Sequence, residues 1–181
     1  MLQITKESLD VLPTRVEYLA KFLDFGSEDE AALQASAPIV GPLVPTILDA
    51  VYAKLLSSDI TAAYFAPTGT NPSEHSQMHE VILTRKDFLK NYLVKLVTTS
   101  EFGVNSPFWK YLDGVAKRHS ELAGKSTFKV AYIHIGALLG YVMNLVIATV
   151  TMEKSLDDAT KNAVISAFNK VSGVSQCVLI N

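Results

Sequence analysis

The sequence has few of the residues on which several common kinds of functional site depend. It contains one cysteine, Cys177, so it can form neither an internal disulfide bond nor a zinc site built from cysteines. It also lacks a glycine-rich loop that would hold phosphate groups, and it lacks the Gly-x-Ser-x-Gly sequence that exposes a nucleophilic serine. Cys177 falls late in an apolar terminal helix, where we expect it to pack without reacting. Nucleophilic catalysis is therefore not expected.

Charge is scarce in this chain and is nearly balanced. Charged residues make up 19% of the 181 residues, and the formal net charge is -2. Because no basic stripe is present, we expect no nucleic-acid partner. The length fits one domain, residues 1–181, with a single buried core. Hydrophobic residues make up 49% of the chain, and the apolar excess is expected to lie around a ligand or against another subunit.

The sequence also lacks a clear membrane or export signal. Residues 1–15 contain no apolar core of signal-peptide length, so we expect a cytoplasmic protein. Residues 131–150 form one long apolar stretch, which His134, Asn144 and several small residues interrupt. A buried central helix is favoured there over a membrane span, and we expect no membrane partner.

Apolar residues recur at helical spacing along most of the chain, and no stretch alternates as a β-strand bounded by hairpin turns would. Capping residues mark several helix starts: Ser27 with Glu30, Ser106 before Pro107, and residues 155–158. The predicted helices cover residues 27–36, 42–57, 60–65, 76–98, a segment from 107 that ends near 119, 128–151 and 158–180, with a loop at 67–72. We therefore predict an all-α fold.

His119 stands out among the four histidines. It continues an apolar stripe that Phe108, Leu112 and Val115 form at the spacing of one helix face. An imidazole in such a place is hydrogen-bonded, cationic at the rim of the core, or bound to a metal. The residues alone leave these three interpretations open.

The other histidines have simpler explanations. His75 and His79 are spaced to chelate a metal on a helix, but their polar surroundings favour an exposed helix start. His134 lies on an apolar helix face, where a core histidine bonded to a backbone carbonyl is favoured over a cofactor ligand. A cofactor held by one imidazole inside a helical sandwich is the chemical option that remains, and haem fits it.

Several ordered segments of the chain resemble the protoglobins and the globin-sensor domain family. The resemblance runs from about residue 16 to residue 151, and the order and spacing of the segments carry it. They are EYL at 17–19, FLDFGSEDE at 22–30, LDAVYAKLLSSDITAAYF at 48–65, RKDFLKNYLVKL at 85–96, FWKYLDGVAKRH at 108–119 and VAYIHIGALLGYV at 130–142.

The resemblance implies a globin fold around haem b, with an extra N-terminal helical segment. It implies that His119 is the proximal ligand of the haem iron and that Tyr52 is the distal tyrosine, able to donate a hydrogen bond to bound dioxygen. Val51 stands where archaeal protoglobin has tryptophan, so the distal pocket is expected to be roomier. Further pocket residues are implied by the same match: Thr84 and Phe88 on the distal helix, and Tyr132, Leu138 and Val142 on the helix after the proximal one.

The function implied by the resemblance is reversible binding of dioxygen, carbon monoxide or nitric oxide by a gas-binding or sensing protein. The alternative is a haem enzyme. Nitric oxide dioxygenation needs a reductase, which we do not find in this chain, and peroxide chemistry needs a distal acid–base residue. His134 or Arg85 would have to reach the pocket for the latter, and helical spacing does not predict that. A haem-free helical interaction domain is the third possibility.

The apolar residues from Phe128 onward are also suited to a helical dimer interface. We expect a homodimer rather than a monomer on this ground. The haem pocket is the alternative explanation for the same apolar excess.

Overall fold

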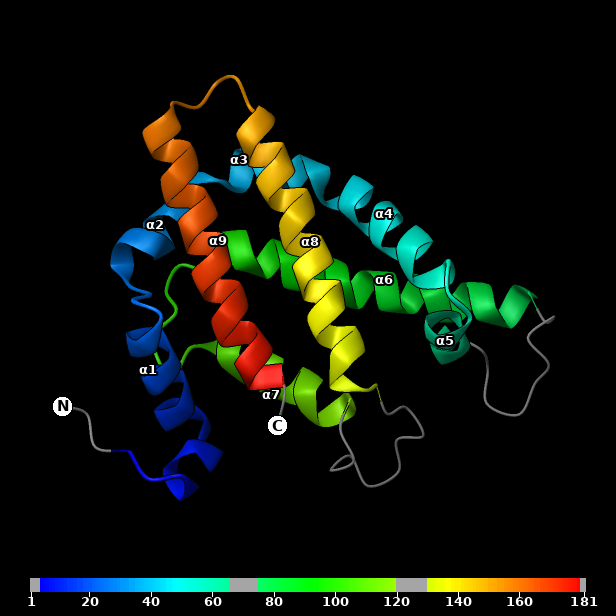
Figure 1. The fold of residues 1–181 in the computed structure, drawn as a ribbon, viewed down its shortest axis with the longest axis horizontal. Coiled ribbons are helices and arrows are strands. Elements are labelled where there is room, and N and C mark those ends of the chain that lie inside the picture. The colour runs from blue at the N-terminus through cyan, green and yellow to red at the C-terminus, as the bar shows by residue number, and fades with distance from the viewer. Residues whose placement is uncertain (1–3, 66–74, 120–129, 180–181) are drawn as a thin grey trace.

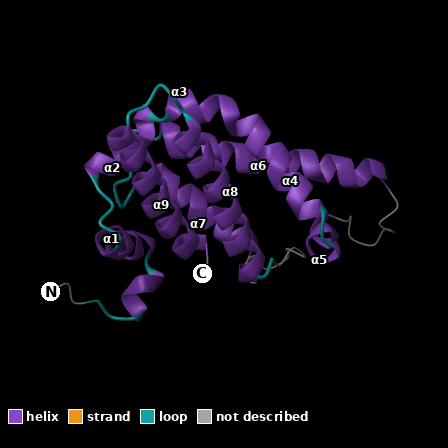
Figure 2. Ribbon diagram, turned by 45° about the horizontal axis from the view of Figure 1, so that its top comes forward, coloured by secondary structure: helices purple, strands orange, loops and turns teal. Residues whose placement is uncertain are grey.

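The computed structural model describes residues 4–65, 75–119 and 130–179. Within these ranges the backbone forms helices, turns and short connections, without a strand (Figure 2), and the predicted all-α class is confirmed. The predicted loop at 67–72 and the first residues of the predicted helix at 128–151 lie outside the described residues. The elements are η1 (Glu7–Asp10), α1 (Leu12–Phe22), α2 (Ser27–Ala35), α3 (Ala37–Val40), η2 (Gly41–Leu43), α4 (Val44–Leu56), α5 (Asp59–Ala62), η3 (Ala63–Phe65), α6 (His75–Thr98), α7 (Pro107–His119), α8 (Tyr132–Met152) and α9 (Asp158–Leu179).

Two of the predicted helix starts are capped as expected. At the start of α7 the Phe108 amide donates to the Ser106 hydroxyl at 3.2 Å, and Pro107 is the first helical residue. At the start of α9 the Thr160 amide donates to the Asp157 carboxylate at 2.7 Å. Each bond satisfies an amide that has no partner within its own helix.

The predicted cap of α2 is wrong by one residue. Gly26 rather than Ser27 is the capping position, and its amide donates to the Asp29 carboxylate at 3.0 Å. Glu30, which we expected to complete the capping box, instead accepts a hydrogen bond from the Phe102 amide at 3.1 Å. The Glu30 carboxylate therefore ties α2 to the loop before α7.

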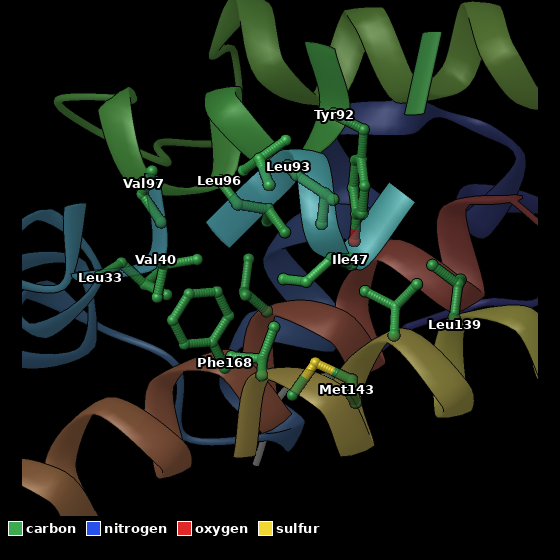
Figure 3. Packing of buried hydrophobic residues seen from close by; sticks show 14 of the residues in the cluster. Leu33, Val40, Ile47, Tyr92, Leu93, Leu96, Val97, Leu139, Met143 and Phe168 are labelled. Atoms are coloured by element: carbon green, nitrogen blue, oxygen red, sulfur yellow. The ribbon is translucent and has the colours of Figure 1, made fainter. Parts of the chain in front are cut away.

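The helices pack in crossed layers around a common core. Figure 1 shows α8 and α9 side by side and antiparallel, crossing α6, and α8 and α9 are also in direct contact. α9 packs against α1, α2 and α7, and α4 packs against α6 and α8. Figure 3 shows the core side chains that these helices contribute, among them Phe168 of α9, Met143 and Leu139 of α8, and Leu93 and Leu96 of α6.

By length and composition alone, α8 and the stretch 27–56 are long and apolar enough to cross a membrane. Core helices of soluble proteins pass the same test. Five side chains of α8 are buried in the common core: Leu139, Val142, Met143, Val146 and Val150. Tyr132, Ile133 and Met152 of the same helix are exposed, so α8 borders the core with one face and is not buried throughout, as the predicted central helix would be.

α7 is held mainly on one side. Its backbone packs against α9 and, less extensively, against α1. Trp109 near its start is fully buried, and the Trp109 indole N–H donates to the Phe102 carbonyl at 2.8 Å. The rings of Phe102 and Phe108 lie edge-on, 4.9 Å apart. Aromatic packing thus fixes the first turn of α7, and its last turn, which ends at His119, extends away from this anchor.

A nearly buried ion pair joins α1 to the middle of α7. The Arg15 guanidinium lies 3.3 Å from the Asp113 carboxylate, and the two side chains are 7% and 15% exposed. Asp113 also pairs with Lys117 at 2.7 Å. The buried Arg15 Nε and Nη1 atoms have no hydrogen-bond partner in the described part of the chain. Arg15 therefore depends on Asp113 more than Asp113 depends on Arg15.

This asymmetry predicts unequal losses of stability. Asp113→Ala should lower the free energy of unfolding by about 3 kcal/mol or more, because it leaves a buried guanidinium without a counter-charge. Arg15→Met should cost less than about 1 kcal/mol, because Asp113 keeps Lys117 and methionine fills the buried site. Urea unfolding of the two variants and of the double variant measures both values, and the double variant should recover most of the Asp113→Ala loss.

Glu17→Ala is the matched control. Its partner Lys21 lies 2.7 Å away, and the two side chains are 49% and 55% exposed, so the loss should stay below about 0.5 kcal/mol. If Arg15→Met lowers the free energy of unfolding more than Asp113→Ala does, the predicted asymmetry between Arg15 and Asp113 is wrong.

Candidate functional site

A cavity of about 610 Å³ lies among α4, α6, α7 and α8, beside η3 and the end of α9. Its volume is within the usual range for sites that hold a cofactor or another small organic molecule. Most of its wall is aliphatic or aromatic. The wall is formed by Tyr52, Leu55, Thr61, Tyr64, Phe65, Arg85, Phe88, Leu89, Tyr92, Tyr111, Leu112, Val115, Arg118, His119, Val130, His134, Ile135, Leu138, Leu139 and Leu179. Arginine and histidine are the ionisable bases in this set, and no aspartate or glutamate is part of the described wall.

His119 lies at the cavity as the last residue of α7. Its Nδ1 atom is 2.8 Å from the Val115 carbonyl oxygen. A carbonyl oxygen only accepts, so Nδ1 carries the proton and donates, and Nε2 is the nitrogen with the lone pair. This is the tautomer and the backbone bond that orient a metal-ligating histidine. The side chain is half-buried at the cavity wall, as a ligand to a group inside it would be.

Tyr52 reaches the same cavity from α4 and is 5% exposed. Its ring lies edge-on to Phe65, with 5.6 Å between the ring centres, and the Lys86 ammonium lies 5.6 Å from the centre of the Tyr52 ring. Burial raises the pKa of the Tyr52 phenol well above its ordinary value, and the positive charge of Arg85 opposes this only in part. The phenol therefore stays protonated at neutral pH and is able to donate a hydrogen bond.

Arg85 and His134 both line the cavity, which helical spacing did not predict. On α6 the lining positions are Arg85, Phe88, Leu89 and Tyr92, which follow one another at helical spacing. The guanidinium of Arg85 makes two contacts at this wall. In the structure it lies 5.0 Å from the Phe65 ring centre, and its Nη1 donates to the Tyr64 carbonyl at 2.6 Å.

Two further predicted pocket residues, Phe88 and Leu138, also line the cavity. Phe88 is 52% exposed, so it covers an open edge of the cavity rather than its interior. The Tyr111 hydroxyl donates to the Phe88 carbonyl at 3.2 Å, and the Arg118 guanidinium lies 5.9 Å from the Phe88 ring centre. These contacts join α6 to α7 across that edge.

The structure does not bring Thr84, Tyr132 or Val142 to the cavity wall. Thr84 is exposed, and its hydroxyl donates to the Glu80 carbonyl at 3.0 Å. Tyr132 is 47% exposed and lies at the start of α8. Val142 is 2% exposed within the core, one turn beyond Leu138. The predicted contacts of these three residues with a haem remain predictions.

Sequence reasoning missed Tyr92, a wall residue that is 6% exposed. Burial raises the pKa of Tyr92 to about 12, and the Ser175 hydroxyl opposes this in part. Its ring stacks near Phe108 at 6.3 Å between centres, and Figure 3 shows it pointing from α6 into the core. The spacing from Arg85 to Tyr92 was the signal available for this residue.

The wall fits a haem in its chemistry. An apolar slot suits the macrocycle, His119 presents the coordinating tautomer, and the guanidinium groups of Arg85 and Arg118 suit a molecule that carries carboxylates. Within the described residues, no group of three or more His, Cys, Asp or Glu side chains is placed to hold a metal ion directly.

Comparison with known proteins agrees with this geometry. A family model described as Protoglobin matches residues 12–177. Among solved structures, the globin domain of a Geobacter sulfurreducens globin-coupled sensor is similar, with a TM-score of 0.67 and 12% identity over 90% of this chain and 93% of that chain. At this identity the likeness shows the fold alone, and the predicted globin fold is confirmed. A comparison with curated proteins gives no match.

The buried phenol of Tyr92 predicts a loss of stability in alkali. In the unfolded chain a tyrosine ionises near pH 10, whereas Tyr92 in the fold keeps its proton to about pH 12. The folded state therefore binds the proton more tightly, and the stability that this gives is lost as the pH rises above 10. Between these values Tyr92 should lower the free energy of unfolding by about 1.4 kcal/mol per pH unit.

Urea unfolding of the wild type and of Tyr92→Phe, over this pH range, measures the effect. The variant should show the shallower decline with pH, whatever its stability at neutral pH. Parallel curves for the two proteins contradict the prediction.

Proposed function

Because the chain belongs to the protoglobin family, we propose that its cavity holds haem b, that His119 binds the iron, and that the protein reversibly binds a diatomic gas. Membership of a globin family implies haem. One observation carries the rest of the proposal: His119 and Tyr52, which the family resemblance implies lie on opposite sides of a haem, line the same cavity. Bound haem supplies an iron atom that takes dioxygen, carbon monoxide or nitric oxide as a ligand.

His119 holds the iron from the end of α7. The bond from its Nδ1 to Val115 fixes the orientation of the ring and directs the lone pair of Nε2 to the iron. The backbone carbonyl is a neutral acceptor, so it raises the electron density of the imidazole less than a carboxylate partner would. This arrangement would suit a carrier or sensor of gas, because His119 would bind the iron as a neutral imidazole rather than as an imidazolate.

Tyr52 donates a hydrogen bond to the ligand on the other side. Its phenol is neutral and nearly buried, so it is a hydrogen-bond donor that is itself largely shielded from solvent. Bound dioxygen carries partial negative charge and accepts such a bond, whereas carbon monoxide is a poor acceptor. The preference for dioxygen should amount to about 1–3 kcal/mol.

We favour gas sensing among the uses of such binding. The similar solved structure is the globin domain of a globin-coupled sensor, which supports this choice. The outward-facing contact of Arg118 with Phe88 joins the helix of the iron ligand to α6, so a shift of α7 on gas binding would reach the surface of the protein.

A peroxidase-like haem enzyme is the second candidate, and one observation favours it. Arg85 and His134 line the cavity, and a guanidinium with an imidazole is a donor and base pair of the kind that peroxide cleavage needs. Consumption of peroxide by the haem-loaded protein in a stopped-flow instrument separates this candidate from simple gas binding.

His119→Ala should abolish or greatly weaken haem binding, because the iron loses its only proposed protein ligand. His134→Ala is the matched control, since it removes the other imidazole of the cavity wall and should leave haem bound. The absorption spectrum of each purified protein, reduced and with carbon monoxide, measures the result. A His119→Ala protein that keeps a full Soret band with unchanged ligand spectra rules out the assignment.

Tyr52→Phe should raise the dissociation rate of dioxygen by about 5-fold to 150-fold, as the loss of a hydrogen bond worth about 1–3 kcal/mol predicts. The dissociation rate of carbon monoxide should change by less than about 2-fold, because that ligand gains little from the donor. Stopped-flow ligand replacement measures both rates. Equal changes for the two gases would mean that Tyr52 shapes the pocket without donating to the ligand.

A further inference from the structure

Two serines of α9 carry buried hydroxyl groups that make no hydrogen bond within the described part of the chain. Ser172 is 4% exposed and Ser175 is 0% exposed, and the Oγ atom of each is without a partner there. A buried hydroxyl that makes no hydrogen bond costs free energy, so native proteins rarely leave one unsatisfied. The surroundings of these two hydroxyls therefore have to supply a partner of another kind.

Other serines and threonines in or beside the helices of this protein find their partner in the backbone. The hydroxyls of Thr84 and Thr98 donate to carbonyls of the preceding turn of α6 at 3.0 and 2.9 Å. Ser36, which is as buried as the two serines of α9, donates to a carbonyl of the preceding turn at 2.6 Å. This bond is the usual local arrangement for a hydroxyl in a helix. Ser172 and Ser175 do not make it, so their Oγ atoms are turned away from the carbonyls of their own helix and toward the core.

The two serines lie on one face of α9. They are three residues apart, which places one above the other on the helix surface. Phe168, four residues before Ser172, and Leu179, four residues after Ser175, continue the same face. Phe168 is buried in the common core, and Leu179 lines the cavity. The two hydroxyls are therefore neighbours within the core, and Ser175 is one turn from a residue of the cavity wall.

Tyr92 of α6 brings a third hydroxyl to this face of α9. Figure 3 shows its ring pointing from α6 into the core, and the residue also lines the cavity. The Ser175 hydroxyl lowers the pKa of the Tyr92 phenol against the larger effect of burial, so the two oxygen atoms lie near each other. The Ser175 Oγ nevertheless makes no hydrogen bond of normal geometry among the described residues. The two hydroxyls are close neighbours that a molecule placed between them could join.

We propose that Ser172, Ser175 and Tyr92 form a binding site for an ordered water molecule between α9 and α6. A hydroxyl both donates and accepts, and water does the same, so each of the three side chains can pair with it in either sense. Buried waters typically bond to two or more polar groups that the protein itself leaves unpaired. A larger guest does not fit, because the surrounding core consists of closely packed apolar side chains. Water can reach the site from the cavity, since Tyr92 belongs to both.

The water determines what Tyr92 contributes to the cavity wall. The phenol has its hydrogen-bond partner on the core side, and the ring of Tyr92 presents apolar surface to the cavity. Tyr92 thus extends the apolar part of the wall and adds no hydrogen-bond donor to it. The site does not rest on the proposed function, because its three hydroxyls belong to the fold of the chain.

Urea unfolding of Ser172→Ala and Ser175→Ala tests the site, with Ser166→Ala as the matched control. Ser166 is an exposed serine of the same helix, so its substitution measures the gain that alanine brings by helix propensity alone. Relative to this control, each of the two core substitutions should raise the equilibrium constant of unfolding by about 2-fold to 12-fold. The reason is that the bound water loses one of its hydrogen-bond partners.

A hydroxyl that is buried without any partner gives the opposite sign. Its removal relieves the free-energy cost of burying it, so the equilibrium constant of unfolding falls below that of the Ser166→Ala control. A decrease of this kind in either core variant, or a value equal to that of the control, overturns the inference.

A high-resolution crystal structure of the full chain locates the water directly. The expected peak lies about 2.5–3.0 Å from the oxygen atoms of at least two of the three hydroxyls. It should disappear or move in the double variant Ser172→Ala and Ser175→Ala. Bonds from both serines to backbone carbonyls, without such a peak, overturn the inference as well. Neither measurement requires haem, so a protein that takes up no haem removes the proposed function and leaves this test intact.

Discussion

The site depends on α7 being anchored on one side and open on the other. Trp109 and Phe108 are buried at the start of the helix, and α9 and α1 pack along it. The face that carries Val115 and His119 borders the cavity. A helix packed on all sides would leave no room for a ligand, and a helix held only at its end would not fix an imidazole. Because the anchor and the open face belong to one rigid element, the position of His119 follows from packing that lies far from it.

The unfilled cavity beside α7 lowers the stability of the fold, and a ligand that fills the cavity offsets this loss. A cavity of about 610 Å³ deprives its apolar wall of the contacts that a close-packed core would make. A flat apolar molecule that fills it restores those contacts, and any ligand that binds the folded state alone stabilises that state. Occupancy of the cavity and stability of the globin fold are therefore coupled. The wall residues both contact the ligand and contribute to the stability of the fold.

Much of the fold could be predicted from local signals, apart from the one-residue error at the cap of α2, and the cavity wall was harder to predict because local signals do not act there. Pro107 after Ser106, and Asp157 three residues before Thr160, mark helix starts because capping involves neighbours in sequence. The residues on the inward face of α6 cannot be predicted from neighbours in sequence in this way. Thr84 and Arg85 are one residue, or about 100°, apart on the helix, and only the packing of α6 against α4 and η3 decides that the arginine lies at the cavity wall. A residue type that is usually exposed gives no hint of this, so helical spacing did not predict Arg85 at the cavity wall, whereas Leu138 was implied there by the family resemblance.

Two hydrogen-bond donors of different charge line the cavity, the neutral phenol of Tyr52 and the cationic guanidinium of Arg85. A neutral phenol stabilises the partial charge of a polar gas without favouring a full charge, whereas a guanidinium interacts with a full charge most strongly. Arg85 also acts on Tyr52, and Tyr52 on Arg85, since burial lowers the pKa of the arginine and the phenol opposes that change. The ionisation of each of these two side chains is therefore coupled to that of the other across the cavity wall.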